Sequence, residues 1–216
     1  KVVITIDGAS SKDLDDAVSL ERDGLGRWVL GVHIADVSHY VRPGSALDLE
    51  AWERGTSVYF ADQVVPMLPR ELSNGICSLN PRVDRLALSC VMTLTPEGEV
   101  VDHTIAKSVI RTTERMTYED CNALLAHSDP ALAERYARIL PMLEDMAALS
   151  RVLEGRRRRR GALELDTRES YVVCDESGTP VDVVLRTPGL SEGLIESFML
   201  AANECVAEHL NRLDKP

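Results

Sequence analysis

Residues 7–16 read DGASSKDLDD and follow directly on residues 2–6, the apolar run VVITI. An apolar run of this kind predicts a buried strand that ends at Asp7. The GASS sequence after Asp7 has the composition of a turn, so the chain can fold back beside the strand. We therefore expect one site with four carboxylates, those of Asp7, Asp13, Asp15 and Asp16.

Clustered carboxylates repel one another, because two like charges about 4 Å apart interact by roughly 4 kcal/mol at an effective dielectric constant near 20. Lys12 is the single cation of the stretch and cannot balance four acids. The acids can extend into water, become protonated at raised pKa values, or bind a divalent cation. Mg²⁺, with Mn²⁺ as the alternative, prefers such oxygen ligands. Leu14, Ala17 and Val18 interrupt and follow the acids, which favours a built site over a solvated loop.

Spacing sets aside two other acid-rich sites. An EF-hand beginning at Asp13 requires Gly at its sixth position and Glu at its twelfth, where this chain has Val18 and Gly24. A phosphoaspartyl phosphatase has a second Asp two residues after the strand-end Asp, and Ala9 occupies that position. Neither calcium sensing nor phosphoaspartyl chemistry is therefore expected.

The composition predicts one globular domain with a sizeable core, since the 216 residues are 44% hydrophobic and 27% charged. No apolar run reaches the length of a membrane span, and the N-terminus is no signal peptide, so we expect a cytoplasmic protein or one whose targeting segment was removed. The net charge of −11 is unusual for a nucleic-acid binder, although arginines are dense at residues 156–160.

The cysteines are odd in number, far apart and never in a Cys-x-x-Cys pair. This pattern predicts reduced core thiols rather than disulfides or a zinc site. The residues concerned are Cys77, Cys90, Cys121, Cys174 and Cys205.

Hydrophobic periodicity and turn residues predict a mixed α/β (α+β) fold with a twisted, largely antiparallel sheet flanked by helices. A strand over residues 27–37 is expected to pair with the first strand through a turn near Gly24 and Gly26. The other predicted strands form hairpins over residues 86–109 and 171–184, the second with its turn at residues 175–178. Helices are predicted over residues 43–55 after a Ser45 cap, from Thr117, over residues 131–160 with a break near Pro141, and over residues 194–211 after a Ser191 cap.

Several polar residues admit two interpretations. His33 and Asp36 are either ligands and acid–base groups or, as we favour, hydrogen-bonded structural groups, and His39 is expected at the surface. Residues 64–81 form a long proline-rich loop, and loops of this length often carry function. Tyr59 at its mouth fits either the core or a platform on which a base stacks.

Six sequence blocks, in order, resemble the catalytic RNB domain of the ribonuclease II and ribonuclease R family, and its ribonuclease R-like bacterial members in particular. The resemblance covers nearly the whole chain and implies one RNB-type catalytic domain over residues 1–216 with an RNB-like fold. The blocks are TIDGASSKDLDDAV (5–18), GVHIADVSHYV (31–41), RGTSVYFADQVVPMLPRELSNGICSLNP (54–81), RMTYED (115–120), RGALELD (160–166) and LIESFMLAAN (194–203).

This resemblance implies a metal-dependent 3′–5′ exoribonuclease that processively hydrolyses single-stranded RNA to nucleoside 5′-monophosphates. In such an enzyme two divalent ions, expected here to be Mg²⁺ or Mn²⁺, activate the water and stabilise the leaving oxygen. The resemblance implies that Asp7, Asp13, Asp15 and Asp16 are metal ligands, and that Asp15 is also the catalytic residue, which holds the second ion or orients the water. It further implies three RNA contacts: Tyr59 guides the RNA, Tyr118 contacts the terminal nucleotide, and Glu196 contacts the 3′-terminal nucleotide.

Alternatives remain for some of these matches. Tyr118 also fits a core residue at the start of a helix. The run at residues 156–160 fits either a phosphate-binding surface or a solvated helix end, where positive charge suits the helix dipole. Leu163 and Leu165 stand where many relatives have a stacking aromatic residue, so one half of the base clamp is not placed.

Family members continue into a segment with a Thr-Ser-Pro-Ile-Arg-Arg-Tyr type motif and carry flanking OB-fold domains, whereas this sequence stops at Pro216 without either. We therefore expect a partial catalytic domain, whose partners are single-stranded RNA and the rest of the enzyme or other RNA-decay proteins. The alternative is a non-catalytic RNA-binding module, or a fragment that needs the missing segment for activity. The intact Asp15 favours the enzyme.

Overall fold

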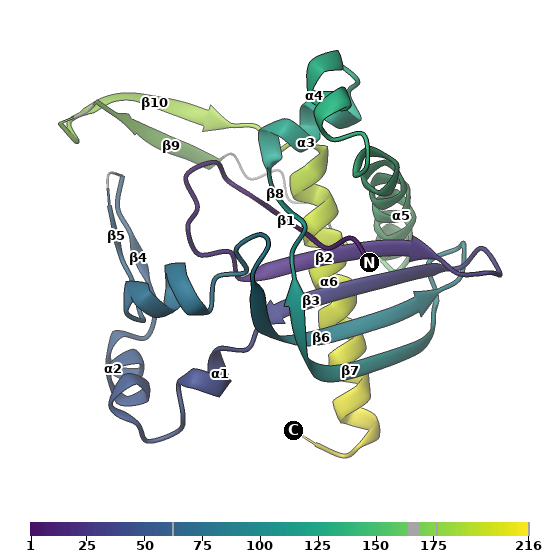
Figure 1. Cartoon of the computed structure of the whole chain (residues 1–216), viewed down its shortest axis with the longest axis horizontal. Coiled ribbons are helices and arrows are strands. Elements are labelled where there is room, and N and C mark those ends of the chain that lie inside the picture. The colour runs from purple at the N-terminus through teal and green to yellow at the C-terminus, as the bar shows by residue number, and fades with distance from the viewer. Residues whose placement is uncertain (62, 164–168, 176, 216) are drawn as a thin grey trace.

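The computed structural model describes residues 1–61, 63–163, 169–175 and 177–215, so Leu165 and Glu176, for which predictions were made, lie outside the described residues. Its centre is a six-stranded sheet in the order β7-β6-β3-β2-β1-β8 (Figure 1). All neighbouring strands are antiparallel except β1 and β8, which are parallel, and the predicted largely antiparallel sheet is confirmed. The strands are β1 (Ile4–Asp7), β2 (Asp16–Arg22), β3 (Trp28–Ala35), β6 (Asp84–Leu94), β7 (Val100–Arg111) and β8 (Glu114–Thr117).

The predicted pairing of the strand at residues 27–37 with the first strand is wrong. Strand β3 pairs instead with β2 and β6, from Asp16↔Ile34 to Arg22↔Trp28 on the β2 side. The reason is that residues after the acids form a strand of their own, in which Ala17 and Leu20 are buried. The expected turn near Gly26 exists, but it joins β2 to β3.

Two long helices, α5 (Leu140–Arg159) and α6 (Leu190–Arg212), cover one face of the sheet (Figure 1). Phe198 of α6 and Leu143 of α5 are fully buried against strand residues such as Ile4 and Met92. Burial of a side chain of this size contributes about 1.5–3 kcal/mol, so this layer is the main core. The layer fixes the sheet on which the acidic residues lie.

The helix start after Thr117 and the break before α5 lie where the sequence predicted. Thr117 Oγ1 accepts a hydrogen bond from the Asp120 amide (3.1 Å) and caps α3 (Tyr118–Leu125). Pro141 lies in the first turn of α5, after the short α4 (Pro130–Arg135), which confirms the predicted break.

The predicted Ser191 cap of α6 is wrong, because the helix begins at Leu190 and its N-cap is Gly189, two residues before Ser191. The Gly189 amide donates to Glu192 Oε2 (2.9 Å), and a Cβ at Gly189 would collide with the Asn122 side chain. Ser191 is buried instead, and its Oγ donates to the Tyr118 carbonyl (3.1 Å), which ties α6 to the start of α3.

A second, smaller core lies on the other side of the sheet. It contains Leu14 from the acidic stretch together with Cys77 and Leu79, which follow the π-helix η1 (Glu71–Ile76). Nearby are the short helices α1 (Val37–Tyr40) and α2 (Ala46–Arg54), the latter capped by Ser45 as predicted. This core joins the acidic stretch to the proline-rich segment.

Two hairpins complete the fold: β4 (Val58–Tyr59) with β5 (Val64–Val65), and β9 (Glu169–Cys174) with β10 (Pro180–Arg186). Both project from the side of the molecule on which the β1–β2 connection lies (Figure 1). All five cysteines are free, as predicted, and all but the half-buried Cys174 are buried. Within the described residues, no helix is both long and apolar enough to cross a membrane.

Candidate active site

The acidic loop, residues 7–16, joins two adjacent strands of the sheet. Asp7 is the last residue of β1 and Asp16 is the first of β2, and Ile4 pairs with Val18 between them. Continuation of this antiparallel register puts Asp15 opposite Asp7. The sheet therefore brings the two ends of the acidic loop together, as the sequence predicted.

The middle of the acidic loop is held by the segment that follows η1. Ser78 Oγ donates to the Lys12 carbonyl (2.9 Å) and accepts from the Leu14 amide (3.1 Å). The Leu79 amide donates to the Leu14 carbonyl (2.8 Å), and the Leu14 side chain is only 1% exposed. Asp13 and Asp15 therefore flank an anchored residue rather than a solvated loop, which supports the interpretation of these acids as a built site.

Burial and neighbouring negative charge raise the pKa of two carboxyls of the acidic loop. The pKa of Asp16 is raised to about 6, first by burial and then by the charges of Asp7 and Asp15. The pKa of Asp15 is also raised, by desolvation from the surrounding protein and by the charges of Asp13 and Asp7, although Asp15 is exposed at the surface. In the described part of the chain no Lys or Arg forms an ion pair with any of the four, so their negative charge is not neutralised.

The donor chemistry of the acidic loop fits a hard divalent cation, because it offers only oxygen ligands. Asp16 Oδ2 is buried and has no hydrogen-bond partner in the structure, which leaves it available to such an ion. Among the described residues, however, no three Asp, Glu, His or Cys side chains are placed to hold a metal ion. The four acids thus share one region without forming a closed ligand cage.

Tyr59 lies beside the acidic loop. It is 67% exposed on β4, and its hydroxyl donates to Asp13 Oδ2 (3.4 Å). An exposed aromatic ring at this place can stack on any base, and it is not a core residue.

Tyr118 and Glu196 occupy different surroundings. Tyr118 follows Thr117, the register partner of Asp7, and is half-buried against the main core, so it lies near the acids and also contributes to packing. Glu196 is exposed on α6 and pairs with Arg157 Nη1 (3.5 Å), in a cleft of about 960 Å³ between α5 and α6. No contact among the described residues joins Glu196 to the acidic loop.

His33 and Asp36 are structural, as we favoured. His33 Nδ1 lies 2.6 Å from Ser89 Oγ, and burial lowers the pKa of His33 to about 4, so the ring is neutral. Asp36 accepts a hydrogen bond from Ser38 (2.6 Å) and pairs with Lys107 (3.0 Å), contacts that lower its pKa. Neither residue is free to act on a substrate.

Sequence reasoning missed Arg115 of β8 and Ser78, which hold the backbone of the acidic loop. Arg115 Nη2 donates to the carbonyls of Ser11 (2.7 Å), Ala9 (2.9 Å) and Gly8 (3.3 Å). Both residues lie within the family-like blocks at 54–81 and 115–120, and that position is their only signal in the sequence.

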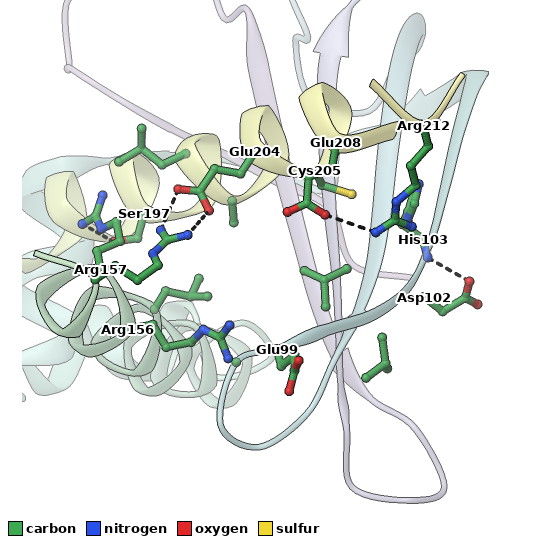
Figure 2. A pocket seen from close by; sticks show the side chains of 17 residues that line it. Glu99, Asp102, His103, Arg156, Arg157, Ser197, Glu204, Cys205, Glu208 and Arg212 are labelled. Atoms are coloured by element: carbon green, nitrogen blue, oxygen red, sulfur yellow. Dashed lines mark hydrogen bonds and ion pairs between the residues drawn. The ribbon is translucent and has the colours of Figure 1, made fainter. Parts of the chain in front are cut away.

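Three arginines of the run at residues 156–160, namely Arg156, Arg157 and Arg160, belong to a charged cluster that we call the arginine seam. It surrounds a cavity of about 340 Å³ between α5, α6 and the β6–β7 turn (Figure 2). Arg160 donates to both oxygens of Glu204 (3.0 and 2.7 Å), and Arg212 pairs with Glu208 (3.3 Å). Its charges balance, because the lining holds four arginines and four acids: Arg156, Arg157, Arg160, Arg212, Glu99, Asp102, Glu204 and Glu208. This favours a structural role over phosphate binding.

Comparison with known proteins shows which proteins this chain is similar to. Ribonuclease R 1 of Lactococcus lactis is 55% identical over 209 residues, 97% of this chain and 26% of that protein. Ribonuclease R of Thermotoga maritima is 48% identical over 217 residues, 100% of this chain and 30% of that protein. The chain thus spans about a quarter to a third of the length of the curated relatives it matches.

A solved structure has the same fold. Mycoplasma genitalium RNase R in complex with double-stranded RNA superposes with a TM-score of 0.92 at 32% identity, over 99% of this chain and 38% of that chain. The RNB domain description matches residues 1–216. On these grounds the chain belongs to the RNB domain family.

Proposed function

We propose that this chain is the catalytic part of a divalent-metal-dependent 3′–5′ exoribonuclease that processively degrades single-stranded RNA to nucleoside 5′-monophosphates. The observation that carries the proposal is the acidic loop, where four carboxylates without cationic partners among the described residues lie at the connected ends of β1 and β2, and an exposed tyrosine contacts one of them. The relatives named Ribonuclease R and the neighbour bound to RNA support the same reaction class.

In this proposal Asp7, Asp13, Asp15 and Asp16 would hold Mg²⁺ or Mn²⁺. Such ions, when bound, supply neutralisation of the scissile phosphate and a water of lowered pKa. Asp15 is the most accessible of the four acids, so we assign it to orient the attacking water or to complete the ion site.

The aromatic residues would position the RNA. Tyr59 is exposed and tied to Asp13, so a base stacked on its ring would lie close to the acids. Tyr118 would contact the terminal nucleotide from the start of α3, and Glu196 would contact the 3′-terminal nucleotide from α6. Stacking on aromatic rings tolerates every base, which suits an enzyme that acts on RNA of any sequence.

The whole chain would form one RNB-type domain of a longer cytoplasmic enzyme, because it covers only part of its relatives. We expect it to associate with the rest of that enzyme or with other RNA-decay proteins. One observation favours a second candidate, a non-catalytic RNA-binding module: no three side chains among the described residues are placed to hold a metal ion.

The test is to incubate the chain with 5′-labelled single-stranded RNA in Mg²⁺, and again in chelator, and to follow product length. We expect stepwise 3′ shortening that requires Mg²⁺ and falls about 10²- to 10⁴-fold in Asp15→Asn, while RNA binding persists. Glu97→Gln, on the exposed β6–β7 turn, is the matched control that removes one distant negative charge. Binding without shortening by the unmodified chain would favour the RNA-binding module.

A further inference from the structure

The side chain of Arg115 contacts the acidic loop without contacting its acids. Arg115 lies on β8 opposite Thr5 of β1, and its Nη2 donates to the carbonyls of Ser11, Ala9 and Gly8 at 2.7, 2.9 and 3.3 Å. The Ser11 amide in turn donates to the Gly8 carbonyl (3.0 Å), so these carbonyls belong to one closed turn. One guanidinium group therefore fixes the whole first half of the acidic loop.

The choice of partners is unusual for an arginine in an acidic environment. Four carboxylates lie in the same stretch, yet among the described residues Arg115 forms no ion pair. Its Nε is buried and has no hydrogen-bond partner. An unpartnered buried N–H is unfavourable, and the hydrogen bonds of Arg115 to the described residues come from Nη2. This orientation keeps the cation on the backbone and leaves the acids without a counter-charge.

The acidic loop needs such a restraint because its acids repel one another. Asp7 and Asp16 are fixed by the strands they end and begin, whereas Asp13 and Asp15 depend on the connecting backbone. Ser78, which follows η1, holds the second half of this connection, and Arg115 holds the first half from β8, the strand that pairs with β1. Without Arg115, repulsion would open the turn and separate the loop acids from Asp7.

We propose that Arg115 is a positioning residue for the reaction: it holds the acidic loop through three carbonyls and thereby sets the spacing of the four acids. Its effect on metal binding rests on the proposed function, whereas its effect on the loop does not. Arg115 also belongs to β8, the strand that places Thr117 opposite Asp7 and leads to Tyr118 at the start of α3, so it links the acids to a predicted RNA contact.

The experiment compares Arg115→Met and Arg115→Lys with Arg111→Met, a control at an arginine whose partner is the exposed Asp84. Hydrogen–deuterium exchange is measured on each metal-free protein in chelator. Mn²⁺ binding is measured by calorimetry, and RNA shortening is measured as kcat and KM.

We expect Arg115→Met to accelerate exchange within residues 8–15 alone and to weaken Mn²⁺ binding about 10- to 100-fold, as loss of a residue that orients metal ligands does. The value of kcat should fall while KM changes little, because Arg115 does not contact the substrate. Arg115→Lys keeps the charge but not the planar fork of donors, so it should restore part of each property.

Two results would overturn the proposal. The first is that Arg115→Met and Arg111→Met show the same hydrogen–deuterium exchange within residues 8–15 and the same Mn²⁺ affinity. The other is faster exchange throughout the chain, in both Arg115 variants, which would show a general structural role. If the unmodified chain binds no Mn²⁺ and leaves RNA intact, the proposed function fails, and the exchange data alone then decide whether Arg115 orders the acidic loop.

Discussion

The acidic loop and the arginine seam are both rich in charged residues, but the seam combines charges of both signs whereas the four acids of the loop have no cationic partner among the described residues. In the arginine seam four arginines face four acids, and Arg160 binds Glu204 through two hydrogen bonds. In the acidic loop the carboxylates face one another, and burial together with like charge raises the pKa of Asp16 to about 6. Paired charges of the first kind join elements, whereas unpaired charges of the second kind reduce stability, which fits the proposed binding of a cation.

The two regions also differ in how the fold holds them. The arginine seam lies between two helices and a turn, and its pairs are largely exposed (Figure 2). The acidic loop is anchored by a buried leucine and by hydrogen bonds from distant segments. The acidic loop therefore depends on hydrogen bonds from distant segments, whereas the arginine seam lies on helices that the main core already holds.

The largest expected effect tests this anchoring. Leu14→Ala should lower the free energy of unfolding by about 2–5 kcal/mol, because Leu14 is 1% exposed within the second core. Urea denaturation in chelator measures the change. The control is Leu25→Ala in the β2–β3 turn, where the side chain is 77% exposed and the change should stay within about 0.5 kcal/mol. Equal effects of the two substitutions would show that the acidic loop is not anchored.

The next-largest expected effect is an increase in the free energy of unfolding. Asp16→Asn should raise the free energy of unfolding at pH 7.5 in chelator, because the folded state disfavours the charged carboxylate. A pKa raised from 3.8 to about 6 corresponds to at most about 3 kcal/mol. The gain is complete above pH 6 and disappears as the pH falls below 3.8, where the carboxyl is protonated in both the folded and unfolded states.

Urea denaturation of both proteins between pH 8 and pH 4 measures this gain. A loss of stability in Asp16→Asn at pH 7.5 would contradict the assignment of unrelieved repulsion to the acidic loop. Addition of Mg²⁺ sharpens the comparison, since it should stabilise the unmodified protein more than the variant.

The smallest effect belongs to the arginine seam. Glu204→Gln should lower the free energy of unfolding at pH 7 by about 0.2–1 kcal/mol, since its side chain is half exposed and solvent screens the pair. Arg160 lowers the pKa of Glu204, so this contribution is present above pH 4.5 and is lost as the pH falls through the lowered pKa. Denaturation at low and high salt measures it, and a gain in stability would remove the contrast with Asp16.

Much of the fold follows from local sequence signals, because these signals act over a few residues. The β6–β7 hairpin, the Thr117 cap and the break at Pro141 all lie where periodicity and turn chemistry predicted them. The predicted partner of β3 was wrong because the residues after the acids were not recognised as a strand, and that strand, β2, is the partner of β3. Local sequence patterns do not indicate which strands become neighbours. The cap at Ser191 was wrong because contacts with Asn122 and Tyr118, some 70 residues away, occupy that side chain.

The sequence by itself determined that this protein has four acids after a buried strand, and the six family-like blocks determined its membership of the RNB family. Only the tertiary structure decided which residues hold those acids, since Ser78 and Arg115 reach the acidic loop from 64 and more than 100 residues away. It also decided that Arg157, Arg158 and Arg160 of the arginine run form ion pairs with glutamates. The physical reason is that the residue type determines the charge of a side chain, whereas its partners depend on which distant segments the fold brings within hydrogen-bond distance.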